Sequence, residues 1–553
     1  MSDPDVSQGL YFLPLGGSGE IGMNLNLFAL DGRWLMVDLG VTFGNETTPG
    51  VDVITPDPAF IRDHADALEA IVLTHAHEDH LGAVAHLWPE LGCPIYATPF
   101  TAAVLRNKLA ERGLVGKVPV NVMALGSRFQ VGPFDIEYVT VTHSIPEPNA
   151  LAIRTPYGTV LHTGDWKFDP RPLLGEPPDT ARLRAVGDEG VLALIGDSTN
   201  APVPGHSGSE SDVRDGLAEV IAGCSGRVAV ACFASNVARV ESVVHAATVN
   251  GRQVALAGRS LWRMTGAARE AGYLQDVPPF LEAEDAAYLP DDEILYICTG
   301  SQGEARAALP RIARDAHPQV RLDPGDTVVF SSRVIPGNEL AIASLQASLV
   351  RAGVRLVTWE DAFVHVSGHP AQDELRRMYE LVRPAIAVPV HGEARHMAVH
   401  GSLARACGVD QVIEVRNGDC VRLAPGKPAT VARVHAGRLW LRQNRLTPEP
   451  EAARLSREEA TGQGSAVVTL ALRHDHSLAD LPLVTSGTLV EGVIEGPVKR
   501  RMQEAVQKAV EAHAATGAQD DQDLRDSIEV IVQKAIFDAH GQRPAVDVHV
   551  VRI

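Results

Sequence analysis

Residues 74–80 read Thr-His-Ala-His-Glu-Asp-His, so that three histidines and an aspartate fall within six residues. They directly follow Ala70-Ile71-Val72-Leu73, an apolar run with the length and β-branched content of a buried strand. Neutral imidazoles and a carboxylate are ligands that suit zinc. Burying such groups without partners would cost several kcal/mol. The stretch therefore indicates a metal site at the end of a strand.

Three further candidate ligands lie downstream, each after a strand-like segment. His143 ends an alternating run, Asp165 follows a short apolar segment, and His391 follows a longer one. Two metal ions about 3.5–4 Å apart can clamp a phosphate during in-line displacement. The sequence therefore offers seven candidate ligands, which are enough for two metals that share a carboxylate. They are His75, His77, Asp79, His80, His143, Asp165 and His391.

The order of these ligands resembles the metallo-β-lactamase-fold hydrolases. That family has the pattern His-x-His-x-Asp-His, followed by a histidine, an aspartate and a last histidine. Asp38, within Leu-Met-Val-Asp-Leu-Gly at residues 35–40, matches the family's first motif, and residues 15–24 resemble its opening hairpin. The long distance from Asp165 to His391 implies an insertion before the last ligand.

The insertion resembles the β-CASP domain of nucleic-acid-processing members. The matching stretches are Gly-Asp-Ser-Thr-Asn at 196–200, His-Val-Ser-Gly-His at 365–369 and Pro-Val-His-Gly-Glu at 389–393. The combination with three more is similar to the ribonuclease J family: Phe-Ala-Ser-Asn at 233–236, Gly-Arg-Ser at 258–260 and Thr-Gly-Ser-Gln-Gly-Glu at 299–304. The departures are small, namely Ala76 in place of a frequent glycine and Val237-Ala238 after the Phe-Ala-Ser-Asn stretch.

The resemblance implies two zinc ions per subunit, with Mn²⁺ or Mg²⁺ as alternatives. Asp165 would bridge them, and Asp38 would support a ligating histidine rather than bind metal. The remaining ligands divide into His75, His77 and His143 for one ion, and Asp79, His80 and His391 for the other.

The resemblance also implies catalytic and substrate-binding residues. Asp79, Asp197 and His369 are the expected catalytic residues, with His369 oriented by Asp197 to protonate the leaving 3′-oxygen. A pocket one nucleotide from the metals would hold a 5′-monophosphate, whereas a triphosphate would fit poorly. Its lining is expected from Ser235, His365 and Ser367, and the further substrate-binding candidates are Arg259 and Gly368.

These residues predict a zinc-dependent ribonuclease of RNA processing and decay that acts on single-stranded RNA. It would be a 5′-to-3′ exonuclease preferring 5′-monophosphate ends, and endonuclease activity stays open. The alternatives are a β-CASP nuclease acting on DNA or tRNA ends, a small-molecule metallohydrolase, and an inactive RNA-binding or assembly subunit. A small-molecule hydrolase would not need the insertion, and inactive subunits typically lose ligands that are all present here.

Composition agrees with an enzyme of several domains. A chain of 553 residues is too long for one core. The net charge of −20 argues against nucleic-acid binding by the whole surface but leaves room for a basic channel. No stretch approaches the ~18 apolar residues of a membrane span. The N-terminus lacks signal-peptide features, and the six cysteines form no C-x-x-C pair, so a cytoplasmic location is expected.

The predicted fold is α/β: a metallo-β-lactamase αββα sandwich with an inserted β-CASP α/β domain and a small C-terminal α/β domain. A homodimer or homotetramer is implied, with the last domain at the interface. The expected boundaries are 1–208 and 365–430 for the sandwich, 209–364 for the insertion, 431–463 for a linker and 464–553 for the last domain.

Overall fold

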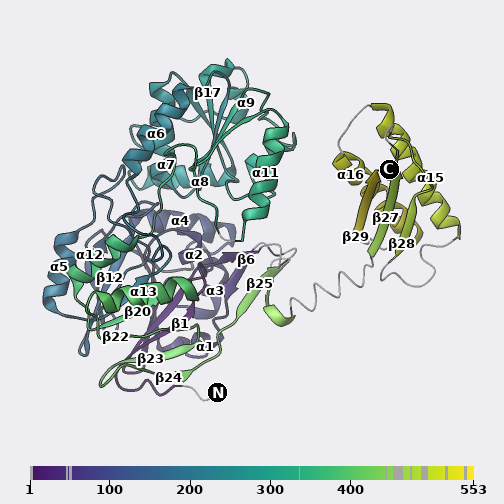
Figure 1. The fold of residues 1–553 in the computed structure, drawn as a ribbon. Helices are drawn as coiled ribbons and strands as arrows, with labels where there is room; N and C mark the ends of the chain where they lie inside the picture. Colours follow the sequence, from purple (N-terminus) through teal and green to yellow (C-terminus); the bar gives the residue numbers. More distant parts are fainter. Residues whose placement is uncertain are drawn as a thin grey trace. The chain divides into compact units, whose positions relative to one another are not determined.

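The computed structural model describes residues 4–44, 48, 51, 53–335, 337–442, 445–451, 465–473, 476–486, 496–516, 521–540 and 545–552. They fall into two compact units, which are described separately. One comprises residues 1–45 and 51–441, and the other residues 46–50 and 442–553 (Figure 1). Among the described residues, no helix is both long and apolar enough to cross a membrane.

Two mixed sheets form the sandwich of the larger unit. The first has the order β24 (Ala429–Arg433), β23 (Asp419–Ala424), β1 (Leu10–Gly16), β3 (Leu25–Leu30), β4 (Arg33–Val37), β7 (Leu68–Val72), β8 (Ile95–Ala97) and β9 (Val120–Val122). The second has the order β10 (Arg128–Val131), β11 (Phe134–Thr140), β12 (Asn149–Thr155), β13 (Gly158–His162), β14 (Val191–Asp197), β20 (Ile386–Val390) and β22 (Gln411–Val412).

The inner faces of the two sheets share one core. Phe12 and Phe28 of the first sheet pack in the same buried cluster as Phe134, Ile153 and Val388 of the second. The outer face of the second sheet is covered by helices whose apolar residues form another cluster. These helices are α5 (Thr180–Glu189), α12 (Gln372–Val382) and α13 (Ala394–Ala406).

Short helices and strands complete the sandwich. The helices that follow β6, β7 and β8 are α1 (Ala59–Arg62), α2 (Glu78–Leu81), α3 (Val84–Leu91) and α4 (Pro99–Glu111). Small sheets are made by β2 (Ser18–Gly19) with β21 (Gly392–Glu393), and by β5 (Thr42–Phe43), β6 (Val53–Pro56) and β25 (Arg438–Arg442). β25 lies within the expected linker 431–463, so the first part of that segment is regular and pairs with β6.

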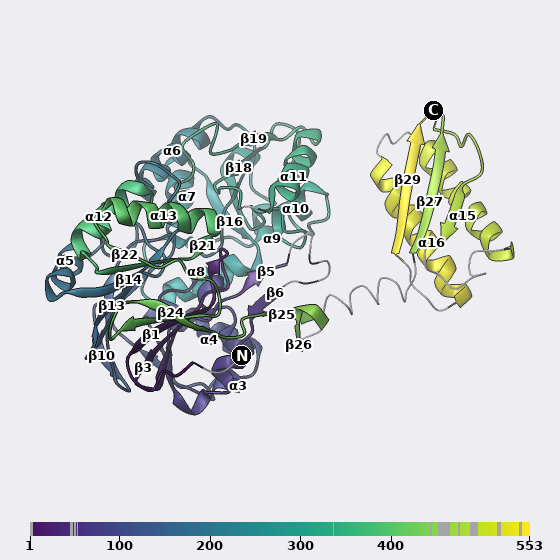
Figure 2. The same cartoon turned by 60° about the horizontal axis from the view of Figure 1, so that its bottom comes forward.

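The insertion is a parallel sheet covered by helices on both faces (Figures 1 and 2). It leaves the sandwich after β14 and returns through β20, the strand that pairs directly with β14. Its strands are β16 (Gln253–Ala257), β17 (Ile294–Cys298), β15 (Val228–Ala231), β18 (Thr327–Phe330) and β19 (Arg355–Val357). One face packs on α6 (Glu210–Ala222), α7 (Val237–Val249) and α8 (Arg259–Glu270), and the other on α9 (Ala283–Ala286), α10 (Ala308–Ala313) and α11 (Glu339–Arg351).

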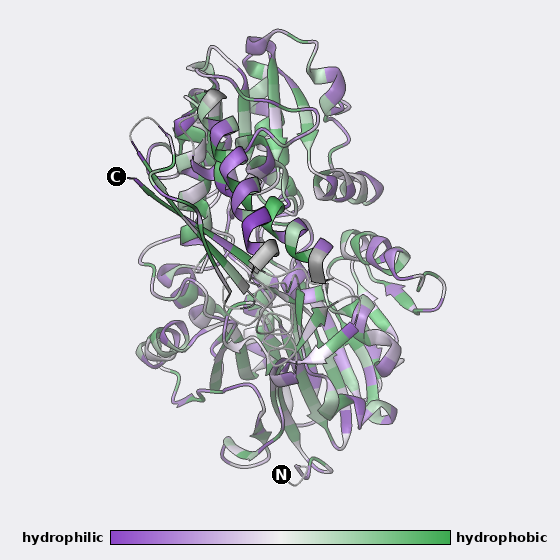
Figure 3. Cartoon of the chain, turned by 90° about the vertical axis from the view of Figure 1, so that its right-hand side faces the viewer, coloured by the Kyte–Doolittle hydropathy of each residue, from purple (hydrophilic) through white to green (hydrophobic). Residues whose placement is uncertain are grey.

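Burial on both faces explains why these strands are near-continuous apolar runs. Figure 3 shows that hydrophobic residues predominate on the strands of this sheet. The parallel α/β insertion and the αββα sandwich confirm the fold class predicted from the sequence.

The smaller unit has a core of its own. Its sheet has the order β28 (Leu483–Ser486), β27 (Ser465–Leu472) and β29 (Ala545–Arg552), and its helices are α15 (Gly496–Thr516) and α16 (Asp521–His540). The apolar stripes on both helices, including Val506, Val510, Ile528 and Val532, are buried against the sheet. β26 (Arg445–Pro448) precedes them. The strand predicted near residues 489–494 lies outside the described residues.

Candidate metal centre

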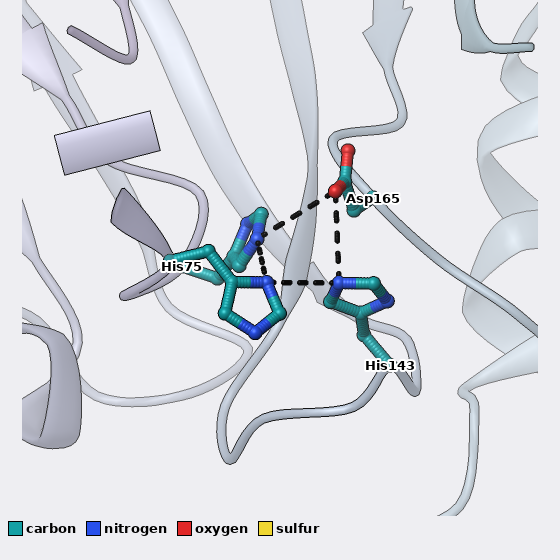
Figure 4. Close-up of side chains that lie close together, drawn as sticks. His75, His143 and Asp165 are labelled. Atoms are coloured by element: carbon teal, nitrogen blue, oxygen red, sulfur yellow. Dashed lines mark hydrogen bonds and ion pairs between the residues drawn. The ribbon is translucent and has the colours of Figure 1, made fainter. Parts of the chain in front are cut away.

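The first group of candidate ligands converges from two sheets. Figure 4 shows His75, His143 and Asp165 turned toward one another. His77 completes the group: its Nδ1 lies 3.1 Å from Nε2 of His75 and 3.0 Å from Nε2 of His143. Oδ2 of Asp165 is 3.9 Å from Nε2 of His75 and 3.6 Å from Nε2 of His143. All four ligand atoms lie within 4.8 Å of one another, which suits one metal ion.

A second group shares Asp165 with the first. Nε2 of His80 lies 3.3 Å from Oδ1 of Asp165, and Nε2 of His391 lies 3.4 Å from Oδ2 of the same carboxylate. Oδ2 of Asp79 is 3.6 Å from His80 and 3.7 Å from His391. Asp165 therefore lies between two sets of nitrogen ligands, as the bridging carboxylate of a two-metal site would.

Strand direction explains why ligands so far apart in sequence meet here. β11, β13, β14 and β20 run the same way in one sheet, so their carboxyl ends share an edge. His143, Asp165, Asp197 and His391 follow these four strands in that order. The stretch that begins at His75 follows β7 of the facing sheet, and α2 starts within it. Together the two sheets build one rim of ligands.

In three of the ligand histidines, His75, His80 and His143, the second ring nitrogen is held by an acceptor oxygen. Nδ1 of His80 donates to Oδ2 of Asp38 at 2.7 Å. Nδ1 of His143 donates to the carbonyl oxygen of Gly368 at 2.6 Å. The Thr74 hydroxyl donates to Asp38 and therefore accepts from Nδ1 of His75 at 3.0 Å. Each proton is thus on Nδ1, and each Nε2 presents a lone pair to the centre.

His391 completes this pattern through a residue that the sequence did not assign a role. Its Nδ1 donates to Oδ1 of Asn24 at 3.1 Å, and Asn24 also donates to the backbone oxygen of Asp79 at 3.1 Å. The only sequence signal was that Asn24 ends the segment resembling the family's opening hairpin. Asp38 takes the supporting position expected for it.

Two backbone features bring the loops close enough. Asp38 and His391 have positive φ angles of 63° and 50°, which non-glycine residues rarely adopt and which often accompany functional sites. A Cβ on Gly40 would lie 1.7 Å from the backbone oxygen of Asp79, so only glycine lets the loop after β4 lie against the ligand stretch.

Electrostatics favours neutral imidazoles in the first group. Burial and the neighbouring imidazoles hold the pKa of His75 and of His77 well below the ordinary value. Burial lowers the pKa of His143 to about 3. Metal ligation requires neutral histidines, and these three are neutral around pH 7.

The second group carries the negative charge. Burial opposes protonation of His391, but the Asp165 carboxylate outweighs it and raises the pKa. Nε2 of His391 and Oδ1 of Asp165 are buried and have no hydrogen-bond partner among the described residues. Buried ligand atoms without a partner are what a bound cation would satisfy. The donor set therefore fits the expected zinc ions.

His369 lies beside the centre, paired with Asp197. Its Nδ1 is 2.8 Å from Oδ2 of Asp197 and 3.8 Å from Oδ2 of Asp165. Burial opposes protonation, but the Asp197 and Asp165 carboxylates outweigh it and raise the pKa of His369 to about 9. The structure thus brings the expected proton donor and its orienting carboxylate to the edge of the ligand groups.

Three family models match the chain. The Beta-lactamase superfamily domain matches residues 33–185, the Ribonuclease J, beta-CASP domain matches 225–349, and the Zn-dependent metallo-hydrolase RNA specificity domain matches 361–415. A Ribonuclease J of Sinorhizobium meliloti is 44% identical, over 98% of this chain and 97% of that protein. One of Mycolicibacterium smegmatis is 39% identical, over 100% of this chain and 98% of that protein.

The chain belongs to the ribonuclease J family. A Ribonuclease J of Helicobacter pylori is 34% identical, over 97% of this chain and 78% of that protein. A crystal structure of a protein of unknown function from Enterococcus faecalis has a similar fold, with a TM-score of 0.52 at 16% identity. The match covers 74% of this chain and 99% of that chain, and it bears on the fold alone.

In this member of the ribonuclease J family, the expected substrate-binding residues lie unevenly around the centre. His365 and Ser367 are half-buried, and Gly368 contacts His143 through its carbonyl. Asn200, a residue given no separate role from sequence, donates to Oγ of Ser367 at 2.7 Å and to the His369 carbonyl at 3.2 Å.

Ser235 and Arg259 stand apart from these contacts. Ser235 is half-buried just before α7, and Arg259 is exposed at the first residue of α8. Within the described part of the chain, neither side chain forms a hydrogen bond or ion pair with residues 365–369. The structure brings together the seven candidate ligands, Asp197 and His369. Ser367 and Gly368 also contact this group, through the backbone N–H of His369 and through Nδ1 of His143.

Proposed function

We propose that this protein is a metal-dependent ribonuclease that trims single-stranded RNA from a 5′-monophosphate end, in the 5′-to-3′ direction. The observation that carries the proposal is the shared position of Asp165 between two sets of histidines, with the Asp197–His369 pair beside it. Family membership supports RNA as the substrate, because curated relatives over nearly the whole chain are named Ribonuclease J.

The chain would hold two zinc ions in the two groups of ligands that share Asp165. Such ions, when bound, would stabilise the charge that develops on a phosphodiester under attack. The supporting oxygens of Thr74, Asp38, Gly368 and Asn24 keep the ligand nitrogens aimed at the centre.

His369 would supply the proton that the leaving 3′-oxygen requires. Its Nδ1 proton is engaged by Asp197, which fixes the ring and favours the protonated form. A protonated ring keeps a second proton on Nε2 that it can transfer. Asp197 is itself held, because one of its carboxylate oxygens accepts from the backbone N–H of Thr199 at 2.8 Å.

The direction of trimming would follow from a pocket for the terminal phosphate. Ser235, His365 and Ser367, together with Arg259 and the backbone of Gly368, carry donors suited to a phosphate dianion. With the 5′-phosphate held there, the next phosphodiester lies at the metals and one nucleotide leaves per cycle. A triphosphate would be too bulky for the same pocket.

We also propose that both metal ions are zinc and that the protein forms a homodimer or a homotetramer. The proposed domain boundaries are those predicted from the sequence. Support for a separate C-terminal domain comes from the independent core of residues 465–552.

An apolar and acidic cleft lies beside His143 and offers one approach to the centre. Its lining includes Glu147 of the sandwich and Tyr273 of the insertion, whose hydroxyl donates to Oε1 of Glu147 at 3.2 Å.

The test uses end-labelled RNA carrying a 5′-monophosphate, a 5′-triphosphate or a 5′-hydroxyl, and single-stranded DNA of the same sequence. The expected result is release of mononucleotides from monophosphate RNA, slow attack on the other ends and little action on DNA. Equal cleavage of DNA and RNA would overturn the substrate, and internal fragments alone would overturn the trimming direction.

A further inference from the structure

A fully buried arginine, Arg239, contacts His365, one of the residues expected to bind the terminal phosphate. Its side chain is 0% exposed and lies near the start of α7. Glu210, at the start of α6 and also buried, accepts from it through two bonds, Nε to Oε2 at 3.0 Å and Nη2 to Oε1 at 2.9 Å. A buried guanidinium needs such a partner, because an unpaired buried charge is strongly unfavourable.

The remaining guanidinium nitrogen contacts two further segments of the insertion. Nη1 of Arg239 donates to the backbone oxygen and to the hydroxyl of Ser331, each at 2.7 Å. It also lies 3.3 Å from the carbonyl oxygen of Val364 and 3.4 Å from Nδ1 of His365. One planar group therefore holds α6, the end of β18 and the segment in which the chain returns to the sandwich.

These contacts determine which nitrogen of His365 carries a proton. A guanidinium can only donate, so Nδ1 of His365 accepts, and the proton of the neutral ring is on Nε2. Burial and the charges of Arg239, Arg333 and Lys167 lower the pKa of His365 to about 3, against the opposing charge of Glu210. The half-buried ring is therefore neutral in the physiological range and offers one N–H donor.

We infer that Arg239, paired with Glu210, is a positioning residue for recognition of the 5′-terminal phosphate. It holds His365 as a neutral ring whose Nε2–H can donate to that phosphate. The inference rests on the proposed function, since it names the residue that prepares one side of the phosphate pocket. Lysine could keep the charge but not this arrangement, because an ammonium group lacks the planar fork that serves Glu210, Ser331 and His365 together.

The test compares Arg239→Lys with Arg252→Lys. Arg252 is 5% exposed in the same insertion, and its guanidinium donates only to backbone carbonyls, among them those of Gly226 and Cys224. It precedes β16, at the amino ends of the parallel strands, whereas Ser331 beside Arg239 follows β18, at their carboxyl ends. The measured quantity is kcat/KM on 5′-monophosphate RNA divided by kcat/KM on 5′-hydroxyl RNA.

Arg239→Lys is expected to lower this preference about 10- to 100-fold, through a higher KM for monophosphate RNA with little change in kcat. Arg252→Lys is expected to keep the wild-type preference. Glu210→Gln, which keeps the side-chain shape, should weaken the preference in the same direction and serves if Arg239→Lys fails to fold.

A double-mutant cycle with His365→Ala tests whether Arg239 acts through the histidine. Once His365 is absent, adding Arg239→Lys should cost less than about twofold in preference, because both changes remove one interaction. Additive losses, or equal losses on monophosphate and hydroxyl RNA, would overturn the inference. If wild type cleaves RNA without end preference, the proposed pocket fails and this inference with it. If His365→Ala abolishes the preference and both Arg239→Lys and Glu210→Gln retain it, the inference alone fails.

Discussion

At the scale of single residues, the candidate centre depends on the atoms that hold each ligand as much as on the ligands themselves. Asp38 and Thr74 follow the adjacent parallel strands β4 and β7, whose ends lie side by side, and together they orient His75 and His80. Partners of this kind fix the tautomer and ring direction of a ligand, and their loss typically lowers metal affinity about 10- to 100-fold.

Removing the shared carboxylate is expected to disable the centre without unfolding the protein. Asp165→Ala, and likewise His77→Ala, should lower RNA cleavage at least about 100-fold, because the shell opens and the two ligand groups lose their link. Elemental analysis of the purified variants should show less zinc than in wild type, while their melting temperature stays close to that of wild type. Asp188→Ala, on the exposed end of α5, is the control. Near-normal turnover by Asp165→Ala with full zinc content would contradict the two-metal arrangement.

Gly368 is expected to matter because it has no side chain. A Cβ there would lie 2.6 Å from both Nδ1 and Cε1 of His143 and 2.9 Å from the Ser144 hydroxyl. Gly368→Ala should therefore displace His143 and lower zinc affinity about 10- to 100-fold. Competition against a zinc chelator measures this affinity. Gly266→Ala in α8 is the control, because a Cβ there would meet no atom within 4 Å. Unchanged zinc affinity in Gly368→Ala would show that the loop can move away from His143 at no cost.

At the scale of elements, one buried charge cluster joins β11, β12 and α5. Glu137 of β11 accepts from Nε of Arg182 at 2.5 Å and pairs with Nη2 of Arg154 at 2.8 Å, and both arginines also pair with Glu189. Burial would raise the pKa of Glu137, but the two guanidinium groups outweigh it and lower the pKa. This cluster holds the strand that leads to His143.

Its contribution to stability should depend on pH. Because the pKa of Glu137 is lower in the folded state, its contribution is present above the unfolded value of about 4.5 and is lost as the pH falls through the folded value. Glu137→Gln should lower the free energy of unfolding by about 1–3 kcal/mol at pH 7. Melting temperatures of the variant and of wild type should converge toward pH 3.

A more exposed pair between β11 and the neighbouring strand β10 gives the matched control. Asp135 pairs with Arg128, both partly open to solvent, so Asp135→Asn should cost less than about 1 kcal/mol at pH 7. A difference in melting temperature between wild type and Glu137→Gln that stays constant from pH 7 to pH 3 would contradict the role given to the charge. The destabilisation would then come from the changed side-chain shape.

At the scale of the whole molecule, the C-terminal unit carries none of the candidate metal ligands, and the sheet formed by its described residues has two edge strands. β28 and β29 are the outer strands, and edge strands are natural sites for pairing with another chain. Leu481, Leu483 and Val530 are exposed apolar residues of the same unit. Its independent core means that it can be removed without opening the core of the larger unit.

Truncation after residue 460 is therefore expected to lower the oligomeric state and to weaken RNA cleavage while zinc content stays the same. Light scattering coupled to size-exclusion chromatography measures the oligomeric state, an assay with end-labelled RNA measures cleavage, and zinc analysis of the same fractions measures the zinc content. The larger unit should keep its melting transition. A truncated protein with the assembly of the full-length chain would show that this domain does not hold the subunits together.

The sequence alone predicted the fold class, which the structure confirms, and the seven candidate ligands, which the structure brings together. Ligand identity is side-chain chemistry, and the spacing within residues 74–80 places four candidate ligands within six residues whatever the rest of the chain does. The apolar runs of the insertion predicted a parallel sheet because burial on both faces demands them. His369 and Asp197 were predicted through motifs, and the structure places them 2.8 Å apart.

Only the tertiary structure decided which partners hold those residues. Asn24 and His391 are 367 positions apart, and Arg239 and His365 are 126 apart. No local pattern marks such pairs, because each member alone reads as an ordinary polar residue. They meet because the ends of β13, β14 and β20 share one edge, and because the chain returns from the insertion beside the strand from which it left. The direction of each hydrogen bond, and hence the nitrogen left free on each histidine, follows from that packing.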